Sequence, residues 1–242
     1  STDELKAHFT IARNNGIKLR EDVLQATFSD FVKTIYTSNP DDTVQRRVDV
    51  IGFSGPYHGA ASDIVRDLTS GPTTDQTTAA TALTLFPDDH KQMTEFETIL
   101  PEISRIVGRQ GTGLTDTSPI KMLVLITDGV RSNRFNFISD IDKAYDGSSE
   151  TLCKAIKDKG IIVAVVNVQY LDSTGDYWFN YWLGRSANFD TGYSTVYAEL
   201  PNAMQECASP GWYFQATDTD QIDGALTKLL DQINKTSLRL IK

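Results

Sequence analysis

Two apolar segments, each preceded by a helical pattern, constrain the fold of this chain most. Residues 121–130 read Lys-Met-Leu-Val-Leu-Ile-Thr-Asp-Gly-Val, and residues 161–168 read Ile-Ile-Val-Ala-Val-Val-Asn-Val. Short, continuous apolar runs of this kind predict strands that are buried on both faces. Helical patterns precede them at residues 91–108 and 149–159. Buried strands that alternate with helices predict a parallel sheet covered by helices.

The remaining pattern predicts one α/β domain with a doubly wound, mostly parallel central sheet and helices on both faces. Further helices are expected at residues 20–36 and 221–235, further strands at 7–11, 47–53 and 212–216, a short antiparallel edge strand within 61–68, and a polar loop at 70–78. The single domain should cover residues 1–242, with an aromatic-rich insertion around 170–200. Ligand crevices in such sheets lie beyond the carboxyl ends of the strands.

Composition excludes two classes of partner. The 242 residues carry a net charge of −9, so no basic surface is available to neutralise the phosphates of a nucleic acid. The longest apolar run, residues 161–166, is far too short to cross a bilayer. Residues 1–4 are polar and acidic, unlike a signal peptide, and such a start suits a piece of a longer protein.

The turn after residues 7–11 and the end of strand 121–130 should lie on the same rim of the sheet. A strand ending in Asp-x-Ser-x-Ser, paired with a later strand ending in Thr-Asp-Gly, is typical of von Willebrand factor A domains. This chain resembles that family, with Ala12, Asn14 and Gly16 where the family has Asp, Ser and Ser. Asp128 matches the aspartate of Thr-Asp-Gly, and either Thr112 or Thr115 stands for the family's middle-loop threonine.

This set of residues predicts a degenerate metal site and no cofactor. Mg²⁺ prefers six oxygen ligands, but Ala12 and Gly16 have no side-chain oxygen and Asn14 offers only a neutral amide. A plainer interpretation is a strand-to-helix turn in which Asn and Gly supply positive φ. The alternative is a metal-dependent adhesin that holds Mg²⁺, or Ca²⁺, through Asn14, Thr112 and Asp128 and binds a carboxylate-bearing ligand.

Two sequence motifs in the second half of the chain indicate a more specific family. A Cys-x-x-Ile-Lys helix leads into strand 161–168, and Cys-Ala-Ser-Pro-Gly-Trp-Tyr-Phe at 207–214 precedes the last helix. This context resembles TadG-like proteins of bacterial tight-adherence (Flp) pilus systems. The resemblance implies an envelope protein with a pilus assembly or minor-pilin-like role, with protein partners among pilus or envelope components. It also implies a periplasmic or surface location and a transmembrane anchor upstream.

The two cysteines, Cys153 and Cys207, come near each other if strands 161–168 and 212–216 are neighbours. In an envelope protein, two cysteines are expected to form a disulfide. Two unpaired buried thiols are the alternative.

A long aromatic loop offers a candidate binding surface. Residues 170–197 contain many aromatic side chains among Gly, Ser, Asp and Asn, including Trp178, Tyr181 and Trp182. Long loops in compact domains are often functional, and aromatic residues often anchor interfaces. The alternative is that these three residues form a short helix that packs onto the sheet.

An enzyme of the α/β hydrolase type is the rival from another class. Gly52-Phe53-Ser54-Gly55 has part of a nucleophile elbow, but Pro56 stands where that motif requires glycine. The three histidines, His8, His58 and His90, share no ligand spacing. The sequence therefore favours a non-enzymatic protein.

Overall fold

Three apolar strands form a parallel sheet at the centre of the molecule. They are β3 (Met122–Thr127), β4 (Ile162–Val168) and β5 (Tyr213–Ala216), in the order β3-β4-β5. The structure is a computed structural model that describes residues 10–11, 13–16, 20–38, 45–54, 64–85, 94–130, 150–169, 183 and 196–240. The register pairs Thr127 with Asn167 and Asn167 with Gln215, so the three strands end together on one rim.

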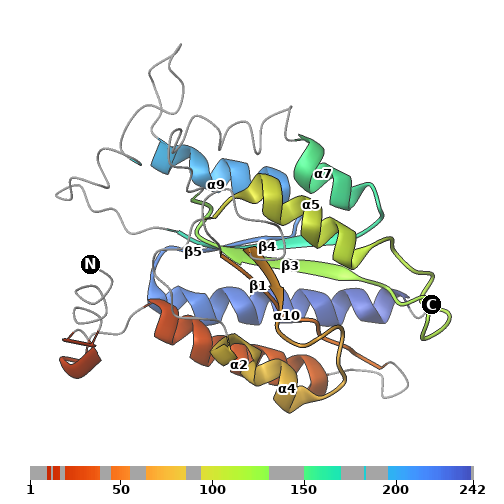
Figure 1. Cartoon of the computed structure of the whole chain (residues 1–242), viewed down its shortest axis with the longest axis horizontal. Coiled ribbons are helices and arrows are strands. Elements are labelled where there is room, and N and C mark those ends of the chain that lie inside the picture. The colour runs from red at the N-terminus through yellow and green to blue at the C-terminus, as the bar shows by residue number, and fades with distance from the viewer. Residues whose placement is uncertain are drawn as a thin grey trace, which may run out of the picture.

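Helices cover both faces of this sheet, as Figure 1 shows. One layer holds α5 (Phe96–Val107), α7 (Glu150–Lys157) and α9 (Val196–Cys207). The other holds α2 (Arg20–Thr37), α4 (Gln76–Thr81), the short 3-10 helix η1 (Ala82–Leu85) and α10 (Thr219–Leu240). Each face has its own apolar core, because alternate β4 side chains point to opposite layers: Val163 and Val165 meet the first, Ala164 and Val166 the second.

A second, smaller sheet lies between the same two layers. It pairs β1 (Ile51–Phe53) with β2 (Val65–Asp67) in antiparallel register, Ile51 opposite Asp67. An isolated bridge between Val48 and Thr73 extends the contact. The sequence predicted one sheet with an antiparallel edge strand, whereas the described residues form two sheets that are not hydrogen bonded to each other.

Local chemistry explains where the predicted elements begin and end. The Asp218 side chain accepts a hydrogen bond from the backbone N–H of Gln221 at 2.9 Å and so caps α10. Gly160, with φ of +83°, closes the turn between α7 and β4. Helices α2, α5, α7 and α10 and strands β3, β4 and β5 therefore confirm the expected elements, with ends shifted by a few residues.

Three expectations about secondary structure were wrong. Thr10 and Ile11 belong to a short helical turn, not to the end of a strand; residues 1–9 lie outside the described ranges. The predicted polar loop 70–78 runs into α4, because Asp75 accepts hydrogen bonds from the N–H groups of Thr77 and Thr78 and starts a helix. Helix α9 was missed: the sequence analysis placed its first residues in the aromatic loop, although α5, which also contains a proline, was predicted.

Candidate functional site

The carboxyl-end rim of the parallel sheet is where the sequence placed the site. Thr127 and Asp128 shape the turn after β3: the Thr127 hydroxyl accepts the N–H of Gly129 at 3.1 Å, and an Asp128 carboxylate oxygen accepts the N–H of Val130 at 2.9 Å. Gly129 has φ of +77°, and a Cβ there would lie 3.2 Å from Met204 of α9. The Thr-Asp-Gly turn is therefore a tight connection packed under α9.

A row of polar side chains crosses the rim from strand to strand. Asn167 is completely buried, and its amide nitrogen donates to the Tyr213 hydroxyl at 3.1 Å. Burial raises the pKa of Tyr213, and the hydrogen bond from Asn167 partly opposes that rise. The Gln215 amide donates to the Gln169 side chain. Sequence reasoning missed these residues; the signal was a polar amide at position 167 in an otherwise apolar strand.

The Asn167 side-chain oxygen is buried and has no hydrogen-bond partner among the residues that the structure describes. An unsatisfied buried oxygen of this kind costs free energy. The acceptor lies among neutral groups, since its register neighbours are Thr127 and Gln215. Asn167, Tyr213, Gln169 and Gln215 are therefore neutral side chains that hydrogen bond to one another across neighbouring strands.

The first half of the predicted metal site lies on a separate helical turn. Ala12 falls outside the described residues, while Asn14 and Gly16 are exposed. Arg13 forms an ion pair with Asp22 of α2 at 2.8 Å, and the Asn15 side chain donates to the carbonyl of Ile11. Gly16 adopts φ of +73°, as the turn interpretation required, but Asn14 and Asn15, from which a positive φ was also expected, do not have one.

The predicted middle-loop threonines lie at the other end of β3 from Asp128. Thr112 and Thr115 belong to the loop 108–121, where the N–H of Thr112 binds the Ser118 hydroxyl. Gln110 holds this loop against the start of β3 and β4, because it bonds the backbone of Lys121 and the carbonyl of Lys159. A six-residue strand is roughly 20 Å long. The structure therefore does not bring Thr112 and Asp128 together.

Of the expected ligand set, the described residues leave Asp128 alone at the carboxyl end of β3. Within the described ranges, no group of three or more His, Cys, Asp or Glu side chains is arranged to hold a metal ion.

The hydrolase motif ends a short strand of the small sheet. Ser54 follows β1, and its N–H donates to the carbonyl of Ile64 at 2.9 Å. Gly55 and Pro56 lie outside the described residues, as do all three histidines. The described part of the chain thus places no histidine beside Ser54.

The aromatic candidates Trp178, Tyr181 and Trp182 also lie outside the described residues. Within residues 170–197, the structure describes Leu183 and the start of α9 at 196–197. Leu183 is buried in the core under α9, and its carbonyl accepts the N–H of Tyr197 at 2.9 Å. Tyr197, which the sequence assigned to the loop, lies in α9.

A disulfide joins Cys153 of α7 to Cys207 of α9, the pair that was expected to be bonded. The Cα atoms are 5.2 Å apart and the two cysteines are 54 residues apart in sequence. Both are buried in the core above β4. The disulfide ties α7 to α9, and α9 is the helix that packs on Leu183 and on the turn at Gly129.

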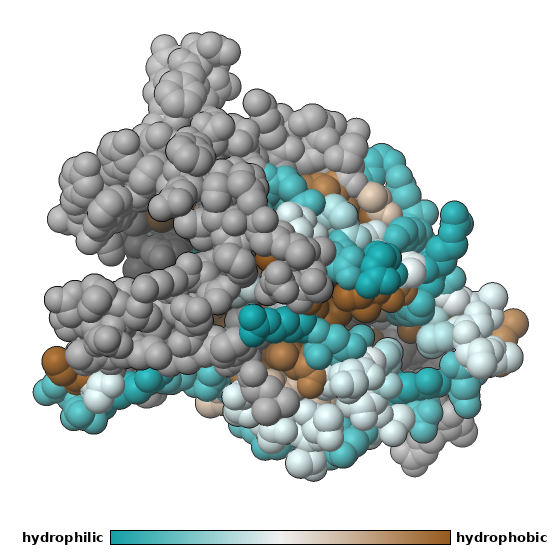
Figure 2. Space-filling view, in the orientation of Figure 1, coloured by the Kyte–Doolittle hydropathy of each residue, from teal (hydrophilic) through white to brown (hydrophobic). Residues whose placement is uncertain are grey.

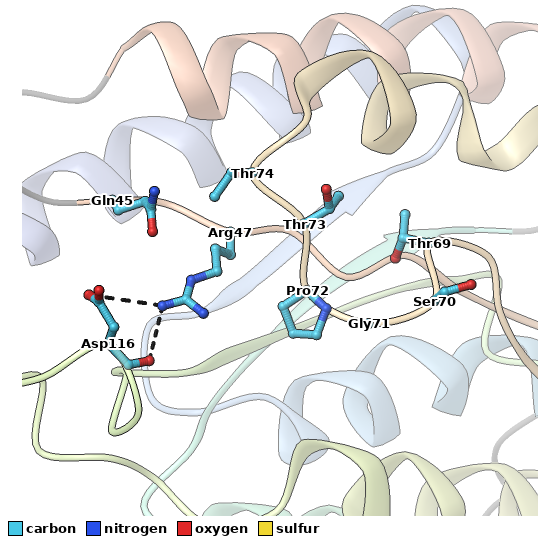
Figure 3. A pocket seen from close by; sticks show the side chains of 9 residues that line it. All are labelled: Gln45, Arg47, Thr69, Ser70, Gly71, Pro72, Thr73, Thr74 and Asp116. Carbon is cyan, nitrogen blue, oxygen red and sulfur yellow. Dashed lines mark hydrogen bonds and ion pairs between the residues drawn. The ribbon is translucent and has the colours of Figure 1, made fainter.

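An open polar pocket of about 530 Å³ lies on the small-sheet side, between the segment before β1 and the loop 108–121. Arg47 reaches across it and donates to the Asp116 carbonyl at 3.0 Å, with the Asp116 carboxylate 4.0 Å away (Figure 3). Ser70, with φ of +56°, and Gly71 form its opposite wall. Because its cation is already engaged by Asp116, the charged side chains of this pocket do not indicate an ionic ligand.

The fold is similar to that of a pilus adhesin, SpaC from Lactobacillus rhamnosus GG. One crystal structure aligns with a TM-score of 0.59 and 18% identity, over 91% of this chain and 28% of the adhesin. A structure of the same adhesin in an open conformation aligns with a TM-score of 0.58 and 18% identity, over 89% and 28%. The chain thus spans less than a third of that adhesin. At this identity the likeness establishes a shared fold.

No protein-family model matches the chain, and no curated protein matches its sequence. None of the helices in the described part of the chain combines the length and the apolar character that a membrane-spanning helix needs.

Proposed function

We propose that this chain is a non-enzymatic protein-interaction domain of a TadG-like, envelope-anchored protein in a tight-adherence pilus system. The observation that carries the proposal is the shared fold with a pilus adhesin over 91% of the chain. The sequence context around Cys153 and Cys207, which also resembles TadG-like proteins, agrees with it independently. In this proposal the fold is a von Willebrand A-type, doubly wound sheet in a single domain.

The interaction does not use a metal ion in this proposal. Asp128 is the one acidic member of the expected ligand set, and Thr112 lies at the far end of β3. One carboxylate in that set supplies too few anionic oxygens for Mg²⁺ or Ca²⁺. Partners are expected to be proteins, and the aromatic segment with Trp178, Tyr181 and Trp182 is the proposed contact surface.

Affinity capture from bacterial envelope extracts tests this function. The wild-type chain should retain a pilus component, identified by mass spectrometry, to the same extent with Mg²⁺ and with EDTA. The variant Trp178→Ala/Tyr181→Ala should retain at least tenfold less, because large aromatic anchors dominate interface energies.

Leu114→Ala is the matched control, since Leu114 is 85% exposed and lies in the loop at the other end of β3. It should capture as well as the wild type. Capture that disappears in EDTA would favour the metal-dependent adhesin, and equal capture by the aromatic variant would reject the proposed surface.

A further inference from the structure

We propose that the open pocket between the segment before β1 and the loop 108–121 binds a neutral sugar ring. This binding activity goes beyond the protein-interaction role proposed above and does not depend on it. The pocket has a volume of about 530 Å³, which lies within the range of about 300–1,000 Å³ that is typical of small-molecule sites.

The first observation is the charge balance of the pocket. Arg47 and Asp116 are the only charged side chains among its lining residues, and they lie 4.0 Å apart (Figure 3). An anion in the pocket would approach the Asp116 carboxylate, which is 90% exposed, and a cation would approach Arg47. Each charge opposes one kind of ion, so the pocket favours a ligand without net charge.

The second observation is that several polar side chains of the lining are free to bind a ligand. Among the described residues, the side chains of Gln45, Ser70 and Thr74 have no hydrogen-bond partner. The Arg47 guanidinium donates to the Asp116 carbonyl at 3.0 Å through one nitrogen. The lining therefore offers donors from the guanidinium, acceptors from the carboxylate, and amide and hydroxyl groups that supply both.

The third observation is that the wall opposite Arg47 is held in place by the protein itself. The Thr69 hydroxyl donates to Asp49 at 2.9 Å and accepts the N–H of Val50 at 3.0 Å. Ser70 follows with φ of +56°, a left-handed conformation that is uncommon for a residue other than glycine. Residues held in such conformations cluster at ligand sites, and a wall fixed in advance lowers the entropy cost of binding.

These observations define the ligand class. The hydroxyl groups of a sugar ring each donate and accept, so neighbouring hydroxyls can bind the guanidinium, amide and carboxylate groups of the lining together. The C–H groups of the ring need a small apolar surface, and Pro72 is the one apolar side chain among the lining residues. A neutral, hydroxyl-rich ring therefore matches both the charge and the hydrogen-bonding groups of the pocket.

Two other kinds of ligand fit this pocket less well. An apolar ligand would find only Pro72 here, whereas apolar side chains reach the surface between the two helix layers (Figure 2). An extended peptide would need free backbone groups with which to pair. The backbone N–H and C=O of Thr73, on the pocket wall, are already bonded to Val48.

Backbone amide NMR of the isotope-labelled wild-type chain tests the site. The probes are the methyl glycosides of glucose, galactose and mannose. At least one of them should shift the amide signals of Ser70, Gly71 and Thr74 in a saturable way, with a dissociation constant on the order of 1 mM. Glucuronate, whose ring carries a carboxylate, should bind no more tightly than methyl glucoside. N-acetylserine methylamide, which has neutral donors and acceptors but no ring of hydroxyls, should leave these signals unchanged.

A double variant tests whether the free side chains make the contacts. Gln45→Ala/Ser70→Ala should weaken sugar binding about tenfold, because two hydrogen-bonding groups are lost. Neither side chain bonds to the described part of the protein, so the variant should melt at the same temperature as the wild type. Thr115→Ala is the control, since Thr115 lies in the loop 108–121 but does not line the pocket. It should bind the sugar as the wild type does.

Four results would overturn the proposal. The first is the absence of a saturable shift at the pocket with all three glycosides, and the second is tighter binding of glucuronate than of methyl glucoside. The third is equal binding of N-acetylserine methylamide, which would mean that the pocket does not select a sugar. The fourth is unchanged sugar binding by the double variant, which would place the sugar elsewhere. The envelope capture experiment stays valid in each case, because it reports on the pilus role without reference to this pocket.

Discussion

β3 and β4 are neighbouring parallel strands of similar chemistry, yet they differ greatly in burial. Every residue of β4 except Ile162 is buried, whereas in β3 only Leu125 is. Helices α7, α9 and α10 pack more closely on β4 than any described helix packs on β3, so coverage of the faces explains part of the difference. β4 has a strand on each side, and β3 has only β4 among the described residues. Burial in a covered sheet is thus decided at the strand edges as well as on the faces.

The largest expected effect concerns the helices that cover β4. The double variant Cys153→Ala/Cys207→Ala removes the bond between α7 and α9, which closes a long loop in the unfolded chain. The free energy of unfolding should fall by about 4 kcal/mol in the chain-entropy description. Urea unfolding without a reducing agent measures it. Dithiothreitol should destabilise the wild type and leave the double variant unchanged; a loss below about 1 kcal/mol would contradict the prediction.

A matched pair of substitutions tests the β3–β4 difference directly. Val166 of β4 and Val124 of β3 face the same core cluster, but Val166 is fully buried and Val124 is partly exposed. Val166→Ala should lower the free energy of unfolding by about 2–3 kcal/mol, and Val124→Ala by about 1 kcal/mol, because less apolar area is lost from the exposed site. Equal losses in urea unfolding would mean that β3 is as buried as β4 in solution.

The cap of α10 should have a smaller effect, since α10 lies under both strands and the cap acts only on its first turn. Asp218→Ala removes the acceptor for the Gln221 N–H, which should cost about 1 kcal/mol. Asp218→Asn is the control, because asparagine caps nearly as well. Thermal unfolding should separate the two variants; if both lose the same stability, the charge and not the cap matters.

The smallest effect is expected in the small sheet. Burial raises the pKa of Asp49, opposed by a hydrogen bond from Thr69 and assisted by the nearby carboxylate of Asp67. The folded state therefore keeps this proton to a higher pH than the unfolded chain does. Its stabilising contribution is present at low pH and is lost as the pH rises from the ordinary aspartate value of about 3.9 through the raised value.

Asp49→Asn removes the ionisable group, so the variant does not lose this stability as the pH rises. The asparagine side-chain oxygen still accepts a hydrogen bond from Thr69. The variant should be more stable than the wild type at about pH 7, by less than about 1 kcal/mol because the site is half-exposed, and equally stable at about pH 3. Melting temperatures measured across this range test it. A variant that is less stable than the wild type at neutral pH would show that the charged carboxylate is favourable.

Much of the architecture could be predicted from the sequence because its signals are local. The apolar runs at 121–130 and 161–168 and the helical spacing of 221–235 depend on residues a few positions apart. The pairing of Cys153 with Cys207 was also expected, since it follows from the two strands being neighbours. Helix α9 was harder to predict, because its apolar residues follow a less regular helical spacing than those of α5 and the helix depends on packing against the core above β4.

The candidate site was harder to predict because it depends on which end of a strand each loop reaches. The resemblance to von Willebrand factor A domains grouped Thr112 or Thr115 with Asp128, but the whole of β3 separates them. The polar row through Asn167 depends on register, which joins residues 40 or more positions apart. Local patterns carry little information about such pairings.

The sequence by itself determined that strands and helices alternate, that residues 161–168 form a buried strand, and that Ala12 and Gly16 bring no side-chain oxygen. Only the tertiary structure decided that β4 is the strand paired with β3 among the described residues, that β1 pairs with β2 in a separate sheet, and that the threonine loop lies at the amino end of β3. The physical reason is that strand formation follows local side-chain chemistry, whereas edges and neighbours are set by contacts between distant parts of the chain.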